Sequence, residues 1–274
     1  TTGAPEAAGL PAGRLLATGP ACRRPRRAAP RPGARVVLAL ALALGTLAAL
    51  APPRAAAHNG QAAWAGPVSG ITVDGDLRDW PAGLPEYELT HPEFGVRPRD
   101  AADFRGAFRV GYDLEQRALF VAVEVRDEST VIDQAQPSSG DTQEGCEAYL
   151  DLPHGHVHAA TTQVILRGQV EQDRGPAANL LRWHRDRTGS RYEWRLDLSA
   201  LDPARLAGGV SVGFDAVACD RDADGSFSWM AWGRGITKVR EAGRKGDLVL
   251  VPPGSQVGTL AGRVSWSGLD AGVV

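Results

Sequence analysis

The chain has 274 residues, and its 30 Lys and Arg against 32 Asp and Glu give a nearly balanced formal net charge of −2. The balance conceals an asymmetry, because residues 1–57 hold eight arginines and one acid, whereas the remainder holds 22 bases and 31 acids, a net charge of −9. An acidic body of this kind argues against nucleic acid as its partner. About 200 residues follow the basic head, enough for one sizeable hydrophobic core.

The basic head has the pattern of an export signal. Residues 36–51 are uncharged and almost wholly apolar, arginines precede them, and Pro52-Pro53 and Ala55-Ala56-Ala57 follow. This order predicts an arginine-rich leader and secretory signal over residues 1–57, with cleavage after Ala57. Because the apolar run is long for a signal, an uncleaved anchor is the alternative, although a bilayer span needs roughly 20 apolar residues. We therefore expect a secreted, periplasmic or cell-surface protein with no membrane contact beyond such an anchor.

The body has the pattern of a β protein. Short alternating or apolar runs are separated by turn residues, and the Asp74-Gly75 and Asp224-Gly225 pairs predict tight turns. The expected strands are 71–73, 108–112, 118–125, 146–152, 161–166, 191–198, 210–219, 227–232 and 247–251, with 108–112 and 118–125 forming a hairpin. One weak helical stretch lies near residues 199–206. The pattern predicts an all-β fold, an antiparallel β-sandwich of immunoglobulin-like or jelly-roll-like architecture.

The C-terminal residues 253–274 differ from the main domain. Pro252-Pro253-Gly254-Ser255 predicts a linker, and residues 260–274 look like the opening of an immunoglobulin-like or transthyretin-like repeat. A segment of about twenty residues cannot bury a core of its own. We expect either further covalently attached domains or a strand that joins the main domain.

Five segments in order carry a family resemblance. They are Ile71–Trp80, Tyr112–Asp127, Asp141–Asp151, Tyr192–Leu201 and Val212–Gly225. Over residues 66–252 the series resembles carbohydrate-binding module family 9 and its wider DOMON-like group. The resemblance implies a non-catalytic β-sandwich that binds a poly- or oligosaccharide, attached to a larger extracellular or envelope protein such as a glycoside hydrolase. The sequence contains no His-Glu-x-x-His and no phosphate-binding glycine loop, so we expect no enzymatic activity.

The tryptophans divide into packing and ligand-binding candidates. Trp80 follows the Asp-Gly turn at the entrance of the domain and is expected to pack. Trp229 and Trp232 have opposite parity on one strand, so one should face inward and the other solvent. A flat indole face suits the C–H-rich face of a pyranose ring, and Trp232 is the predicted sugar platform.

The polar ligand candidates lie on the strand 146–152. Glu147, Tyr149 and Asp151 share one face of this strand. A carboxylate accepts paired hydrogen bonds from sugar hydroxyls, so Glu147, together with Arg234 and Tyr149, is predicted to orient the ring. A solvated polar face is the alternative interpretation.

Two other functions remain open at this point. Sugar-binding members of the family tend to hold the ring between two aromatics, and the stretch Pro137–Asp141 has none, although Trp183 or Tyr149 could substitute. This absence favours a structural or interaction β-sandwich of the same fold without sugar binding. Some DOMON relatives bind haem through Met and His. However, Met230 is the only methionine and looks like core, and no Cys-x-x-Cys-His motif is present, so no haem is expected.

Three further groups could carry chemistry. Asp220, Asp222 and Asp224 alternate before Gly225, which predicts either a calcium site or an Asx-rich hairpin turn. Cys146 and Cys219 in an exported domain predict either a disulfide or two buried thiols. The histidines at 154, 156 and 158 could bind zinc or copper if extended, but the Pro153-His-Gly-His sequence favours a polar loop.

Overall fold

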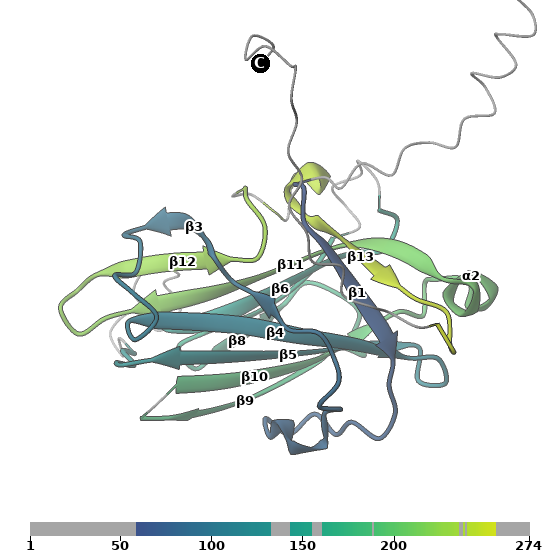
Figure 1. Ribbon diagram of the computed structural model, residues 1–274, viewed down its shortest axis with the longest axis horizontal. Coiled ribbons are helices and arrows are strands. Elements are labelled where there is room, and N and C mark those ends of the chain that lie inside the picture. The colour runs from purple at the N-terminus through teal and green to yellow at the C-terminus, as the bar shows by residue number, and fades with distance from the viewer. Residues whose placement is uncertain are drawn as a thin grey trace, which may run out of the picture. The chain divides into compact units, whose positions relative to one another are not determined.

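The computed structural model describes residues 59–132, 143–154, 161–187, 189–235, 238 and 240–255 (Figure 1). The predicted leader and the C-terminal strand from residue 260 lie outside these residues. The strands are β1 (Ala62–Pro67), β2 (Tyr87–Glu88), β3 (His91–Gly95), β4 (Phe104–Asp113), β5 (Ala118–Asp127), β6 (Gly145–Asp151), β7 (Thr161–Arg167), β8 (Val170–Asp173), β9 (Leu180–Asp186), β10 (Gly189–Asp197), β11 (Val210–Arg221), β12 (Phe227–Ala231) and β13 (Gly246–Leu250). The helical elements are η1 (Leu77–Asp79), α2 (Pro203–Gly208) and η3 (Ala242–Arg244).

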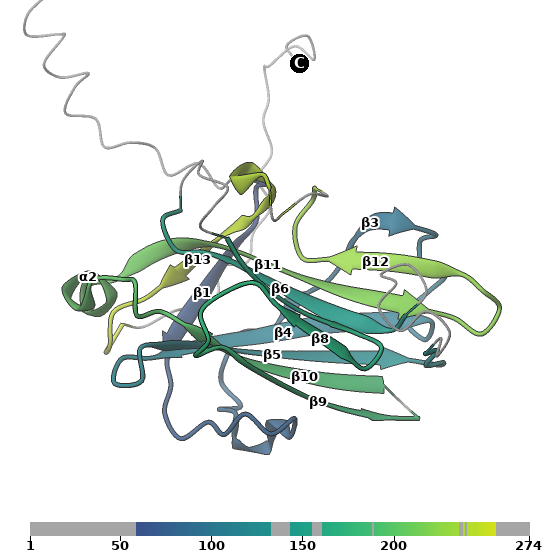
Figure 2. The same ribbon diagram turned by 180° about the vertical axis from the view of Figure 1, so that it is seen from behind.

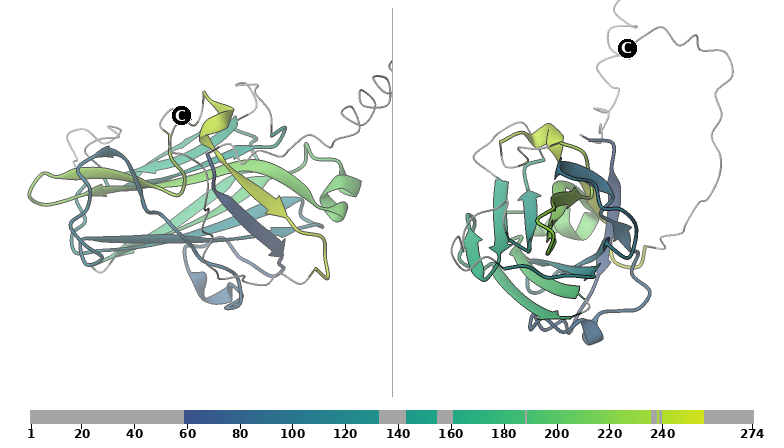
Figure 3. Two further views of the ribbon diagram at one scale, coloured as in Figure 1. Left: turned by 45° about the horizontal axis from the view of Figure 1, so that its top comes forward. Right: turned by 90° about the vertical axis from the view of Figure 1, so that its left-hand side faces the viewer.

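The strands form two layers, as the predicted β-sandwich requires (Figure 3). The β11 sheet has the order β8-β7-β6-β11-β13, with β12 beside the C-terminal half of β11 and β3 beside β12. The β5 sheet has the order β4-β5-β10-β9, with β2 beside β4. β1 joins the two sheets, because Ala62–Ala65 pair with β13 and Gly66–Pro67 pair with β4. Both of these pairings are parallel, whereas the other strand pairings of the described residues are antiparallel. The expected purely antiparallel arrangement is therefore corrected at β1.

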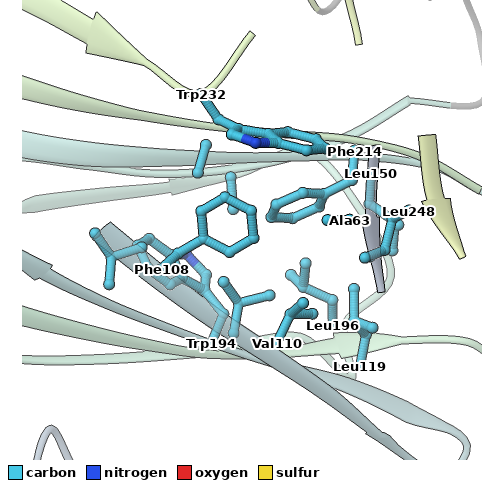
Figure 4. Close-up of a cluster of buried hydrophobic side chains, with 14 of the residues drawn as sticks. Ala63, Phe108, Val110, Leu119, Leu150, Trp194, Leu196, Phe214, Trp232 and Leu248 are labelled. Carbon is cyan, nitrogen blue, oxygen red and sulfur yellow. The ribbon is translucent and has the colours of Figure 1, made fainter. Parts of the chain in front are cut away.

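The core lies between the two sheets and follows from the alternation of each strand. Alternate residues of β11 and β5 face inward, among them Phe214 and Val121, and they meet the aromatic side chains of Phe108 and Trp194 (Figure 4). Met230 also lies in this core, as predicted. The predicted hairpin is confirmed as β4 and β5, which pair over ten residues each.

The segment that carries the Asp74-Gly75 turn packs on the outer face of the β5 sheet. Trp80 is buried there against Phe120 and Ala122, which confirms its predicted packing role. Residues 71–73 do not form the expected strand. The amide of Thr72 donates to the Asp79 carboxylate, and the amides of Asp74 and Gly75 donate to the Glu193 carboxylate. These amides are therefore not available for a sheet ladder.

Glu193 of β10 fastens this segment to the sheet. One carboxylate oxygen accepts from the amides of Asp74 and Gly75 at 2.9 and 3.0 Å, and the other accepts from the Trp80 indole at 2.8 Å. We expect Glu193→Gln to lower the free energy of unfolding by about 1.5–3 kcal/mol. The NH2 group of the glutamine would replace one carboxylate oxygen and could not accept a hydrogen bond from the N–H group that faces it. Chemical denaturation followed by circular dichroism measures this loss. An unchanged midpoint would show that the segment does not contribute to stability.

The helical stretch begins later than expected. α2 starts after Asp202, whose side chain accepts from the amide of Ala204 at 2.8 Å, and Pro203 occupies its first turn. An N-cap aspartate followed by proline is a typical helix start, so the capping residue and not the preceding apolar run determines the boundary. Of the helices in the described ranges, none has the length and apolar character needed to span a membrane.

The two body cysteines are free, so the disulfide alternative is wrong. Cys146 pairs across the sheet with Ala218, and Cys219 pairs with Gly145, a register offset by one residue. Successive side chains point to opposite faces of a sheet, so Cys146 faces the core while Cys219 faces outward. Two thiols on opposite faces cannot be joined without moving the backbone. Burial raises the pKa of both thiols.

Candidate functional site

The outer face of the β11 sheet carries the polar residues that the sequence singled out. Glu147 and Tyr149 project from β6 on the side opposite Cys146 and Leu150, which belong to the core. Neighbouring positions of the same parity are Gln163 and Arg167 on β7, Val217 on β11 and Trp229 on β12. The strand alternation thus gathers aromatic and charged side chains on one face.

Glu147 is the centre of a hydrogen-bonded group on this face. One of its oxygens accepts from Nη2 and Nε of Arg167, at 3.0 and 3.3 Å, and the other accepts from the Tyr149 hydroxyl. Gln163 donates to the same hydroxyl at 3.2 Å. Burial and the Glu147 charge raise the pKa of the Tyr149 phenol, so it stays a neutral donor. The structure brings Glu147 and Tyr149 together as expected, but both are buried, and the partly exposed member of the group is Arg167.

Trp229 and Arg167 lie at the two ends of one row across the sheet. Trp229 pairs with Cys219, Cys219 with Gly145, and Gly145 with Arg167. Three strand spacings separate the ends, which places their Cα atoms about 14 Å apart. Both end residues are partly exposed, whereas the Cys219 between them is buried. The accessible groups of this row are therefore an aromatic side chain at one end and a guanidinium at the other.

An aromatic cluster surrounds Trp229. Its ring centroid lies 5.5 Å from that of Phe94 on β3 and 6.2 Å from that of Phe227 on β12. Phe94 is 54% exposed, an unusual position for a large apolar ring. Phe94 is not predicted from the sequence, because the pairing of β3 with β12 is not visible in a linear pattern. The available signal was a phenylalanine within the polar, turn-rich run His91–Gly95.

Trp232 is not the exposed platform that the sequence predicted. It is 3% exposed and lies between the sheets, with its ring centroid 5.4 Å from Phe108 and 6.3 Å from Phe214 (Figure 4). The opposite parity of Trp229 and Trp232 is confirmed, but their assignments are reversed. Trp232 follows the last residue of β12 and still donates its amide to Ala216, so it continues the inward-facing set of Ser228 and Met230.

Two other predicted site residues lie elsewhere. Arg234 is exposed beyond the end of β12. The burial of His91 and, to a smaller extent, the charge of Arg234 lower the pKa of His91. The guanidinium that pairs with Glu147 is that of Arg167 and not that of Arg234. Trp183 packs against the main core from β9, so it is not the second aromatic of this face.

Carboxylates gather at the end of the sandwich opposite α2. Two of the three predicted calcium ligands, Asp220 and Asp222, lie close to Asp127 of β5, with carboxylate oxygens within 4.8 Å of one another. The third, Asp224, does not belong to a close group of carboxylates among the described residues. Asp224 is exposed and accepts from the amide of Ser226 at 2.8 Å, as in an Asx turn. Burial and neighbouring carboxylates raise the pKa of Asp127 to about 7 and that of Asp220 to about 8.

The first of the three histidines, His154, lies in a turn and not in a strand. His154 has a positive φ of 51°, its amide bonds to the Asp151 carbonyl, and its ring nitrogen lies 2.6 Å from the Asp247 carboxylate. This turn confirms the predicted bend at Pro153-His154. His156 and His158 lie outside the described residues.

Comparisons with known proteins support the fold. No protein-family profile matches the chain, and no curated protein matches it in sequence. Two solved structures of a carbohydrate binding module family 9 from Caldicellulosiruptor kristjanssonii, in complex with cellotriose and with glucose, are similar with a TM-score of 0.58 at 14% sequence identity. They cover 74% and 73% of this chain and 100% of their own chains. The chain therefore has a β-sandwich fold of the carbohydrate-binding-module kind, and the DOMON-like grouping stays a prediction.

Proposed function

We propose that this chain is a non-catalytic carbohydrate-binding domain, and that its ligand is an oligosaccharide or polysaccharide chain bound on the outer face of the β11 sheet. The observation that carries the proposal is the accessible Phe94–Trp229 aromatic pair on the face that also carries the Glu147–Arg167 ion pair. The similarity to solved structures whose bound molecules are cellotriose and glucose supports the choice of ligand class.

Each accessible group has a distinct role in this proposal. The indole of Trp229, extended by Phe94, offers an apolar surface for the C–H face of a sugar ring. Arg167 offers N–H donors to sugar hydroxyls, and the two hydrogen bonds from Arg167 to Glu147 hold its guanidinium in one orientation. Glu147 is thus a positioning residue, in place of the direct ligand contact that its sequence position suggested.

The remaining expectations from the sequence complete the proposal. The basic leader and its apolar run support export, and the linker after Val251 supports covalent attachment to further domains. The acidic body supports a partner other than nucleic acid.

An interaction domain without sugar binding is the second candidate function. It is favoured by the burial of Glu147, Tyr149 and Cys219, because buried polar groups are not available to a sugar. It is also favoured by the exposure of Val96 next to the aromatic cluster, since exposed apolar side chains suit a protein surface as well as a sugar.

Titration calorimetry of the full chain with cellotriose, together with affinity electrophoresis on a panel of soluble polysaccharides, separates the two functions. We expect binding by the wild type and a loss of at least about tenfold in affinity for Trp229→Ala, because a stacked indole contributes more than about 1.4 kcal/mol. Arg167→Ala should weaken binding without changing the stacking surface.

Trp64→Ala is the matched control. Trp64 is another partly exposed tryptophan, on the outer side of β1, and does not belong to the aromatic cluster of Trp229. This variant should bind as the wild type does. A folded wild type that binds neither cellotriose nor any polysaccharide of the panel would refute the sugar proposal and leave the interaction domain.

A further inference from the structure

The C-terminal ends of β5 and β11 lie at the end of the sandwich opposite α2 (Figures 1 and 2). Carboxylates from these two strands lie close together. Asp127 is the last residue of β5 and has the parity of the inward-facing Val123 and Val125. Asp220, near the end of β11, has the parity of the inward-facing Ala216 and Ala218. These side chains are 8% and 3% exposed. Two acids thus occupy positions that apolar residues fill elsewhere on both strands.

Each of these acids has one oxygen without a hydrogen-bond donor. Asp127 accepts the amide of Ser129 at 3.0 Å and Asp220 accepts the hydroxyl of Ser228 at 3.1 Å, in each case with one oxygen. The second oxygens, Oδ2 of Asp127 and Oδ1 of Asp220, are buried and have no partner within the described part of the chain. Buried carboxylate oxygens without donors are costly, so a group with positive charge is strongly favoured between them.

No side-chain cation among the described residues fills this role. The nearby guanidinium of Arg99 is directed to Asp103 and Glu128, at 2.9 and 2.8 Å. Asp103, Glu128 and Asp222 form a second group of carboxylates whose oxygens lie within 4.8 Å of one another. Asp222 therefore belongs both to this group and to the group with Asp127 and Asp220. The hydroxyls of Ser129 and Ser226 orient Asp222, at 3.1 and 2.6 Å.

We propose that Asp127, Asp220 and Asp222 bind a calcium ion that joins the end of β5 to the β11–β12 turn. All donors are carboxylate oxygens, the ligands of hard cations, and calcium accepts six to eight oxygens in flexible geometry, whereas magnesium requires a near-ideal octahedron. The site differs from the consecutive loop that the sequence suggested, because Asp127 of the opposite sheet replaces Asp224. The cation joins the two sheets at the end of the sandwich opposite α2, and it does not depend on the proposed sugar binding.

Calcium binding and thermal unfolding of the full chain test the site. After treatment with EDTA, calorimetric titration with calcium chloride should show saturable binding. The unfolding midpoint should rise by about 5–10 °C at roughly a hundred times the dissociation constant, since a ligand of the native state stabilises it by mass action. Absence of both binding heat and midpoint shift, or a response to magnesium but not to calcium, would overturn the proposal.

Isosteric variants identify the donors. Asp127→Asn and Asp220→Asn should each abolish the calcium shift, yet unfold at a higher temperature than the wild type in EDTA, because each removes one of two facing buried charges. Asp224→Asn is the matched control and should retain the calcium shift. Loss of the shift in Asp224→Asn with retention in Asp127→Asn would overturn the inter-sheet site in favour of a loop site.

Discussion

Replacing Trp232 with alanine should lower the free energy of unfolding by about 3–5 kcal/mol, the usual cost of truncating a large buried aromatic. The indole contacts the rings of Phe108, Phe214 and Tyr87, with centroids 5.4, 6.3 and 6.2 Å away. It also lies directly over Gly246, where a Cβ atom would approach the ring to 2.5 Å. A cavity would remain because the facing β13 backbone cannot fill the space. Urea denaturation followed by circular dichroism measures the loss.

Trp232→Phe serves as the control for this prediction. The smaller ring retains most of the apolar contact, so the loss should be less than half of that for alanine. If Trp232→Ala unfolded at the wild-type midpoint but no longer bound cellotriose, the core assignment would be wrong and the platform assignment from the sequence would be restored.

Replacing Asp215 with alanine should cost about 3–5 kcal/mol, because it leaves a buried ammonium without its counter-ion. Lys238 Nζ lies 3.0 Å from the Asp215 carboxylate, and these side chains are 3% and 0% exposed. Asn59 and the amide of Gly233 also donate to Asp215, both at 3.3 Å. Burial raises the pKa of Asp215 to about 7, while the neighbouring Lys238 opposes this rise.

A double-mutant cycle with Lys238→Met separates the ion pair from the packing. The double variant should recover a large part of the stability lost in Asp215→Ala, because an apolar side chain of similar length has no charge to desolvate. Thermal and urea unfolding of the four proteins give the coupling free energy. Additive losses would show that Lys238 does not depend on Asp215.

The strands that the sequence predicts correctly are β4 to β7 and β10 to β13, which have clear alternating or apolar runs. β4, β5, β10 and β11 each have nine or more residues, and at least six of these are buried in each strand. β2 was not predicted because two residues carry no periodicity, and β3 was not predicted because it lies in the polar, turn-rich run His91–Gly95. β1 was missed as well, since its role in joining the sheets depends on parallel partners distant in the chain.

The candidate site was predicted only in part. Glu147 and Tyr149 share a face, as their spacing requires. Their partner Arg167 was not identified, because pairing between β6 and β7 determines which guanidinium reaches Glu147. Phe94 joined the site for the same reason, through the pairing of β3 with β12.

The sequence by itself determined the β-sandwich class, the turns at Asp74-Gly75 and Asp224-Gly225, and the opposite orientation of Trp229 and Trp232. These are local properties, since alternation and turn chemistry act within a few residues. Only the tertiary structure decided which tryptophan is buried and which of the two thiols faces the core. It also decided that Asp127 and Asp220 lie close together across the interior. The physical reason is that a strand has two equivalent faces until its register with neighbouring strands and its position over the opposite sheet select the buried one.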